Sequence, residues 1–190
     1  MSEEKMDLDG ARRSFLSGTG KFVLTGAAVA MMAGVGGRTL IGTAQASEGD
    51  VLILNGAVAA EHEAVAAYQL AAESGLLGAG ALKLGLTFQD HHKQHVDALS
   101  STIKSLGGVA AAPLATYDFP THKLVDEASV LAFAAGLEKG AVSAYLGAVP
   151  ILEDRELAKV AASILGDEAM HWAVLRNALG QDPVPSAFMS

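Results

Sequence analysis

The stretch Gly166-Asp167-Glu168-Ala169-Met170-His171 decides how this chain folds and where its chemistry lies. Glu168 and His171 stand three positions apart, so on a helix both side chains leave from one face, about one turn apart. A carboxylate and an imidazole that converge from one helix face supply half of a transition-metal site. One such pair does not by itself predict a metal site, and the prediction depends on similar residues at similar spacings elsewhere in the chain.

The same layout occurs twice. Glu138 precedes Glu168 by 30 positions, and Glu61 precedes His92 by 31 positions, with His95 following His92 at i, i+3. An internal repeat fixes the architecture before single residues are interpreted. This repeat predicts two helical hairpins, each of which points a Glu and an i, i+3 pair into a shared centre.

Apolar periodicity predicts four helices, at about 51–73, 78–106 (starting at Gly78 or Ala79), 124–149 and 153–179. Gly107 and Gly180 are expected to close the second and the fourth helix, because glycine accepts the left-handed conformation of a helix cap. The segment 109–122 contains two prolines and lacks a helical pattern. We expect it to cross the length of the bundle.

Composition bounds the classes of function. The chain has 190 residues, which is enough for one domain with a real core, and only 5% of them are aromatic, which favours close-packed helices over a sheet. It has no cysteine, so a disulfide framework, a thiolate metal site and a cysteine nucleophile are excluded. The formal net charge of −8 does not fit a nucleic-acid binder.

The first 46 residues are set aside from the fold. Arg12-Arg13-Ser14-Phe15-Leu16 precedes an apolar run at 22–37, and Ala44-Gln45-Ala46 offers a cleavage site. This pattern resembles a twin-arginine signal peptide, which implies export to the periplasm or the cell exterior and no stable membrane insertion after cleavage. An uncleaved N-terminal anchor is the alternative, although the run is shorter than the roughly 20 residues of a membrane span.

Region 51–179 resembles the ferritin-like superfamily, closest to exported bacterial ferritin-like proteins and more distantly to rubrerythrin. The matching pieces are Glu61 with Tyr68, His95-Val96-Asp97-Ala98-Leu99, Glu138 with Tyr145, and Asp167-Glu168-Ala169-Met170-His171. The resemblance implies an all-α, antiparallel four-helix bundle at 47–180 with a long crossover between its second and third helices, followed by a tail at 181–190. It also implies a homodimer, since bundles of this superfamily commonly self-associate.

The resemblance further implies a di-metal centre that holds two ions, iron first, with manganese or zinc as alternatives. The implied ligands are Glu61, His92, His95, Glu138, Glu168 and His171. The family pattern has Glu-x-x-His on the second helix, and here His92 occupies the Glu position. Three carboxylates against two divalent ions leave a formal charge of +1, and imidazole shifts the preference towards Fe, Zn, Cu or Ni. An asymmetric or mononuclear site therefore stays open.

Two assignments remain open at this level. His91 and His95 share a helix face at i, i+4, as His92 and His95 do at i, i+3, and only the repeat favours His92. Tyr68 and Tyr145 lie two turns after Glu61 and Glu138, and they either hydrogen-bond metal-bound carboxylates or simply pack in the core.

Two functions of different class fit these residues. The first is a di-metal oxidoreductase or metal-handling protein that reacts with dioxygen or peroxide, in which Glu138 or Glu61 bridges the ions. The second is a structural or stress-protective ferritin-like scaffold that binds metal weakly or not at all. Whether the protein is an enzyme is left open by the sequence.

Overall fold

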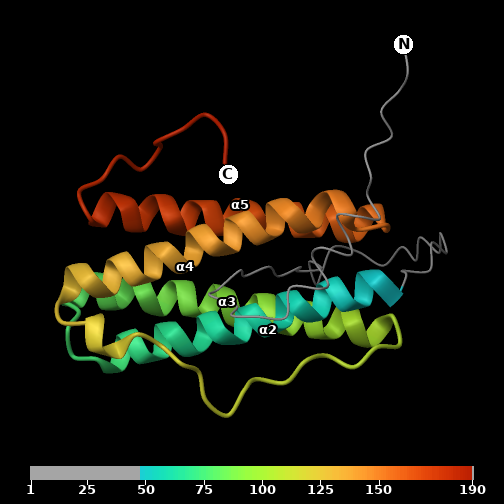
Figure 1. Ribbon diagram of the computed structural model, residues 1–190, viewed down its shortest axis with the longest axis horizontal. Coiled ribbons are helices and arrows are strands. Elements are labelled where there is room, and N and C mark those ends of the chain that lie inside the picture. Colours follow the sequence, from blue (N-terminus) through green and yellow to red (C-terminus); the bar gives the residue numbers. More distant parts are fainter. Residues whose placement is uncertain (1–47, 190) are drawn as a thin grey trace.

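The computed structural model describes residues 48–189, and over this range the chain is helical with no strand (Figure 1). The long helices are α2 (Glu48–Glu73), α3 (Ala79–Ser105), α4 (Glu127–Ala148) and α5 (Arg155–Ala178), with short 3-10 turns η1 (Thr121–Lys123) and η2 (Val149–Ile151). The predicted four-helix bundle is confirmed, and each helix boundary lies within three residues of its expected position. The proposed signal peptide lies outside the described residues.

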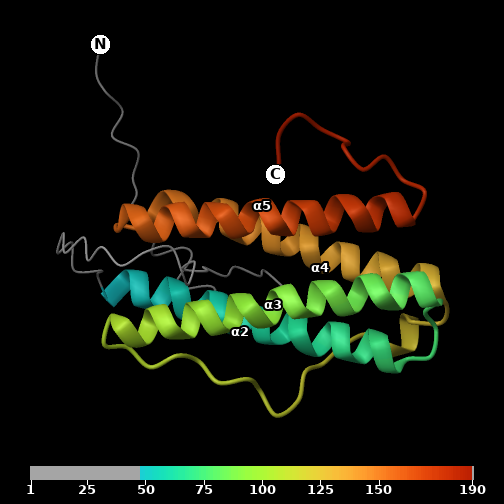
Figure 2. The ribbon, with the colours of Figure 1, turned by 180° about the vertical axis from the view of Figure 1, so that it is seen from behind.

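The bundle consists of two helical hairpins, α2–α3 and α4–α5, and packing is most extensive within each hairpin (Figures 1 and 2). Between them, the segment 106–126 runs back along the bundle and returns the chain to the end where α3 begins (Figure 1). Because of this return, α4 runs antiparallel to α2, and the predicted long crossover is confirmed.

Local chemistry explains most helix ends. Gly75, Gly107 and Gly180 have φ values of 70°, 81° and 70°, the left-handed conformation that terminates a helix. The start of α4 differs from expectation, since it begins at Glu127 rather than near position 124. Asp126 accepts the backbone N–H of Ser129 at 2.8 Å, and the Ser129 hydroxyl accepts the backbone N–H of Asp126 at 3.0 Å. This capping box fixes the first turn.

The core is divided along the bundle axis. The larger apolar cluster fills the half where α2 begins and α3 ends, and includes Ile53, Leu54, Val58, Leu99, Ile103 and Ile164. A smaller cluster fills the other half and includes Tyr68, Phe88, Leu131 and Leu175. The buried carboxylates and imidazoles come from the helical turns between these two clusters.

Two buried or half-buried polar side chains fasten the connections. The carboxylate of Asp50, on the first turn of α2, is fully buried and accepts the backbone N–H groups of Glu153 and Asp154 at 2.9 and 3.0 Å, just before α5 begins. The amide of Asn55 donates to the carbonyl of Val109 and accepts from the N–H of Ala111. The second contact pair holds the start of the crossover against α2.

Within 48–189, every helix falls short of the combined length and apolar character that a membrane span requires.

Replacing Asp50 with Ala is expected to lower the free energy of unfolding by about 1–3 kcal/mol, because two partly buried backbone N–H groups just before α5 lose their acceptor. Urea denaturation followed by circular dichroism measures this change. Asp118→Ala, at an exposed site in the crossover, is the control and should leave stability nearly unchanged. Equal stability of the two variants would contradict this role of Asp50.

Candidate metal centre

The six residues expected to form a site converge at the centre of the bundle. Each helix contributes at least one of them, and all six side chains are buried. They are Glu61 from α2, His92 and His95 from α3, Glu138 from α4, and Glu168 and His171 from α5. Residues 110 positions apart in the chain are thereby brought together, as the repeat predicted.

The six residues form two overlapping groups that could each hold a metal ion. One group is Glu61, His92, His95 and Glu168, and the other is His92, Glu138, Glu168 and His171. In each group the four donor atoms lie within 4.8 Å of one another. His92 and Glu168 belong to both groups, so they occupy the shared centre of the site.

The shared residues direct different atoms to the two groups. His92 Nδ1 lies 2.7 Å from Glu61 Oε2, while His92 Nε2 lies 3.3 Å from Glu138 Oε1. Glu168 Oε1 lies 3.3 Å from His95 Nδ1, while Glu168 Oε2 lies 3.5 Å from His171 Nδ1. One imidazole and one carboxylate therefore stand between the groups, each offering one atom to either side.

Four donor atoms at the centre are buried without a hydrogen-bond partner. These atoms are His95 Nδ1, His171 Nδ1 and both carboxylate oxygens of Glu168. Glu168 Oε1 lies 3.3 Å from His95 Nδ1 and Glu168 Oε2 lies 3.5 Å from His171 Nδ1, and neither contact is a hydrogen bond. A buried polar atom without a partner costs about 1–3 kcal/mol, and more when it is charged. The residues present therefore fit metal ions, which would supply the missing partners.

The carboxylates perturb the acid–base behaviour of the imidazoles. Burial by itself lowers the pKa of His95, but the neighbouring carboxylates of Asp167, Glu168 and Glu61 raise it to about 11. Burial likewise lowers the pKa of His171, and Glu138 and Glu168 together raise it to about 9. Desolvation raises the pKa of Glu168 to about 7, against the opposing charge of His92. The metal-free centre therefore favours protonated imidazoles.

Both tyrosines hydrogen-bond a carboxylate of the site, and neither bonds the Glu that precedes it in its own half of the repeat. The Tyr68 hydroxyl donates to Glu138 Oε1, and the Tyr145 hydroxyl donates to Glu61 Oε1 at 3.3 Å. Each tyrosine thus reaches across to the Glu of the other hairpin. Burial, followed by the charge of the neighbouring carboxylate, raises the pKa of both phenols, so they remain neutral donors.

The competition between His91 and His92 is resolved by position. His92 is buried and belongs to both groups, whereas the side chain of His91 is 37% exposed and lies outside them. His91 Nδ1 instead lies 2.9 Å from His171 Nε2 and 3.3 Å from Asp167 Oδ2. Sequence reasoning did not single out Asp167, although its i, i+4 spacing to His171 places the two on one helix face.

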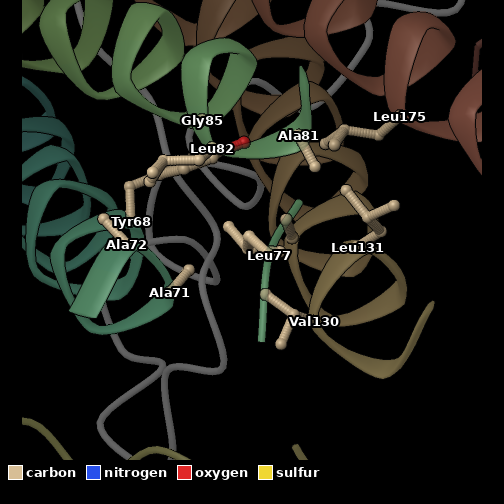
Figure 3. A pocket seen from close by; sticks show the side chains of 11 residues that line it. Tyr68, Ala71, Ala72, Leu77, Ala81, Leu82, Gly85, Val130, Leu131 and Leu175 are labelled. Carbon is tan, nitrogen blue, oxygen red and sulfur yellow. The ribbon is translucent and has the colours of Figure 1, made fainter. Parts of the chain in front are cut away.

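A narrow apolar pocket lies beside Tyr68, where α2 ends and α3 begins (Figure 3). Its walls are almost entirely aliphatic, and they come from all four helices. The lining residues include Ala71, Leu77, Leu82, Leu131 and Leu175. The pocket therefore borders the tyrosine that donates to Glu138.

Residues 49–181 match the family described as Ferritin-like domain, and the chain belongs to this family. Among solved structures, a conserved hypothetical protein, rv2844, from Mycobacterium tuberculosis is similar, with 23% sequence identity and a TM-score of 0.64. That match covers 73% of this chain and 96% of the other. At this identity the likeness shows a shared fold alone. No curated protein sequence matches the chain.

The metal-free protein is expected to lose stability as the pH rises from about 6.5 to about 11. His95 and His171 have folded-state pKa values of about 11 and about 9, above the unfolded value of 6.5, so their contribution is complete below pH 6.5 and is lost as the pH rises through the folded values. Because burial raises the pKa of Glu168 to about 7, ionisation of this carboxyl lowers the stability of the folded state as the pH rises from 4.5 to 7.

Urea denaturation in the presence of a chelator at several pH values tests this dependence. The double variant His95→Gln/His171→Gln should show a smaller fall in stability over the same range, whereas His62→Gln, on α2 outside both groups, should behave as the wild type. A wild-type stability that rises or stays level with pH would contradict these pKa shifts.

Proposed function

We propose that this protein is an exported ferritin-like metal-binding protein whose bundle centre holds two metal ions, iron or manganese, for chemistry with dioxygen or peroxide. One observation carries this proposal. Two four-residue groups share His92 and Glu168, and four buried donor atoms at their centre have no hydrogen-bond partner. A structural core would normally satisfy such atoms, while a pair of cations would satisfy all four.

The donor set defines which ions fit. Three carboxylates and three imidazoles make a mixed oxygen and nitrogen set, which suits Fe, Mn and Zn better than Mg or Ca. Two divalent ions against three carboxylates leave the centre at a formal charge of +1. This excess charge favours the divalent over the trivalent state, so the chain should hold a reduced metal pair more readily than an oxidised one.

The shared position belongs to Glu168 and His92. The sequence favoured Glu61 or Glu138 as the bridging carboxylate, but each of these belongs to one group only. Glu168 presents one oxygen to each group, and His92 presents one ring nitrogen to each. Glu168 would therefore help to hold both ions, whereas Glu61 and Glu138 would each help to hold one.

The remaining residues control protons and access. Bound iron or manganese supplies one-electron redox chemistry towards dioxygen or peroxide. The Tyr68 hydroxyl donates a hydrogen bond to Glu138 Oε1 and the Tyr145 hydroxyl donates one to Glu61 Oε1, and these bonds orient both carboxylates. The apolar pocket beside Tyr68 excludes charged molecules and suits a small apolar reactant such as dioxygen. Burial of all six side chains keeps bulk water from the centre.

A scaffold that functions without metal, in a structural or stress-protective role, is the second candidate. The observation that favours it is the charge balance of the metal-free centre, where three protonated imidazoles would offset three carboxylates. The contact of 2.7 Å between His92 Nδ1 and Glu61 Oε2 is a good hydrogen bond without any ion. Metal content therefore distinguishes the two candidates.

Elemental analysis of the protein, purified without chelator, is expected to find about two equivalents of metal per chain. Glu61→Ala and Glu138→Ala should each retain about one equivalent, because each removes a ligand from one group only. Glu168→Ala should lose both. Glu63→Ala is the control, since Glu63 lies on the same helix as Glu61 and belongs to neither group.

Circular dichroism verifies that each variant is folded. Full metal content in Glu168→Ala would refute the di-metal centre, and a metal-free wild type would favour the scaffold.

The proposal of export rests on the sequence that precedes the bundle. Arg12-Arg13-Ser14-Phe15-Leu16 and the apolar run after it support a twin-arginine signal and a periplasmic or extracellular location. Replacing Arg12 and Arg13 with Lys should retain the full-length chain in the cytoplasm, as cell fractionation and mass spectrometry would detect. Arg38→Lys is the matched control and should leave export intact. Unimpaired export of the double variant would contradict this assignment.

The expected homodimer also belongs to this proposal. Its support is the resemblance to ferritin-like bundles, and light scattering of the mature chain measures it directly.

A further inference from the structure

We propose that His91, Asp167 and the outer nitrogen of His171 form a third cation site, at the surface of the bundle, through which divalent ions reach the buried pair. This inference rests on the proposed metal-binding function. The three donor atoms lie within 4.8 Å of one another. Asp167 Oδ2 lies 3.3 Å from both His91 Nδ1 and His171 Nε2, and these two nitrogens are 2.9 Å apart.

The outer site is joined to the inner groups by imidazole rings that face both ways. His171 directs Nδ1 to Glu138 and Glu168 and directs Nε2 to Asp167 and His91. His95 has the same arrangement, with Nδ1 towards Glu61 and Glu168 and Nε2 at 3.4 Å from Asp167 Oδ2. An ion held by the outer nitrogen of either ring is separated from the inner centre by one ring width. When both nitrogens of a ring hold ions, the ring releases its N–H proton to solvent.

The exposed fractions of these side chains increase from the inner groups to the outer site. The six inner side chains are buried, whereas His91 and Asp167 are 37% and 22% exposed. Within residues 48–189, His91 and Asp167 are the two potential ligands that both contact His95 or His171 and are exposed to solvent. A hydrated ion can therefore meet His91 and Asp167 without any opening of the bundle.

The donors define the class of ion. Two imidazole nitrogens and one carboxylate oxygen favour borderline divalent ions such as Fe²⁺, Co²⁺ and Zn²⁺, while Mg²⁺ and Ca²⁺ prefer oxygen. Three protein donors leave further positions for water. Such a site is expected to bind more weakly than the buried groups, which each offer four donors. Weak binding suits an ion that is transferred from the outer site to the buried groups.

A simpler role for Asp167 has to be separated from this one. A carboxylate that accepts the outer N–H of a metal-ligating histidine orients that ring, and Asp167 is placed to do so for His95 and His171. That role needs no His91. The ring of His91 nevertheless turns Nδ1 towards the same oxygen and the same ring nitrogen. Replacing His91 therefore distinguishes a cation site from a role of Asp167 that only orients the rings of His95 and His171.

The test is a titration of the metal-stripped full chain with Co²⁺, followed by absorption spectroscopy and stopped-flow mixing. The wild type is expected to bind two ions tightly and a third more weakly. In His91→Gln the third should weaken by at least about tenfold, the scale on which one supporting group changes metal affinity. Filling of the buried pair should also slow by at least about tenfold. His62→Gln, on α2, is the matched control and should behave as the wild type.

Each other outcome has a distinct meaning. Two tight ions that fill at the same rate in His91→Gln and the wild type would overturn the third site and leave the proposed function intact. Glu168→Ala should lose the tight ions and keep the weak one, which supports an outer site independent of the inner pair. A wild type that takes up one His91-dependent ion, unchanged in Glu168→Ala, would contradict the proposed function and the loading role together.

Discussion

The constraint on which the structure depends is the burial of three carboxylates among three imidazoles inside an apolar bundle. A buried charge without a partner costs several kcal/mol, so no member of this set is stable at the centre unless the others are within a few ångströms. The members come from all four helices. The antiparallel order of the helices and the long crossover are the topology that brings them to one level along the bundle axis. Apolar clusters on both sides complete the enclosure.

The replacement of a carboxylate by His92 gives this centre its particular character. An imidazole has a nitrogen on each of two edges, so His92 contacts Glu61 on one side and Glu138 on the other, as a carboxylate at this position would. Its charge, however, depends on its proton. Because the surrounding carboxylates raise its pKa despite burial, it balances the centre when no metal is present.

The two ends of the site have opposite polarity. On one side, Tyr68 donates to Glu138 and also lines an apolar pocket. On the other side, the outer nitrogens of His95 and His171 face Asp167, which is partly exposed to solvent. A centre with one apolar and one polar approach can receive a gas and a cation by separate routes.

The sequence by itself determined the four helices, the crossover and the six central residues. These follow from local rules: helical periodicity, glycine caps, and the i, i+3 spacing repeated in both halves. Only the tertiary structure decided that Glu168 is shared, that His91 lies outside, and that Asp167 links His95 to His171. Those facts depend on how the two hairpins are rotated against each other, and residue spacing within one helix carries no information about that rotation. The start of α4 is different, because the Asp126–Ser129 capping box is visible in the sequence and its local hydrogen bonds override the apolar pattern before it.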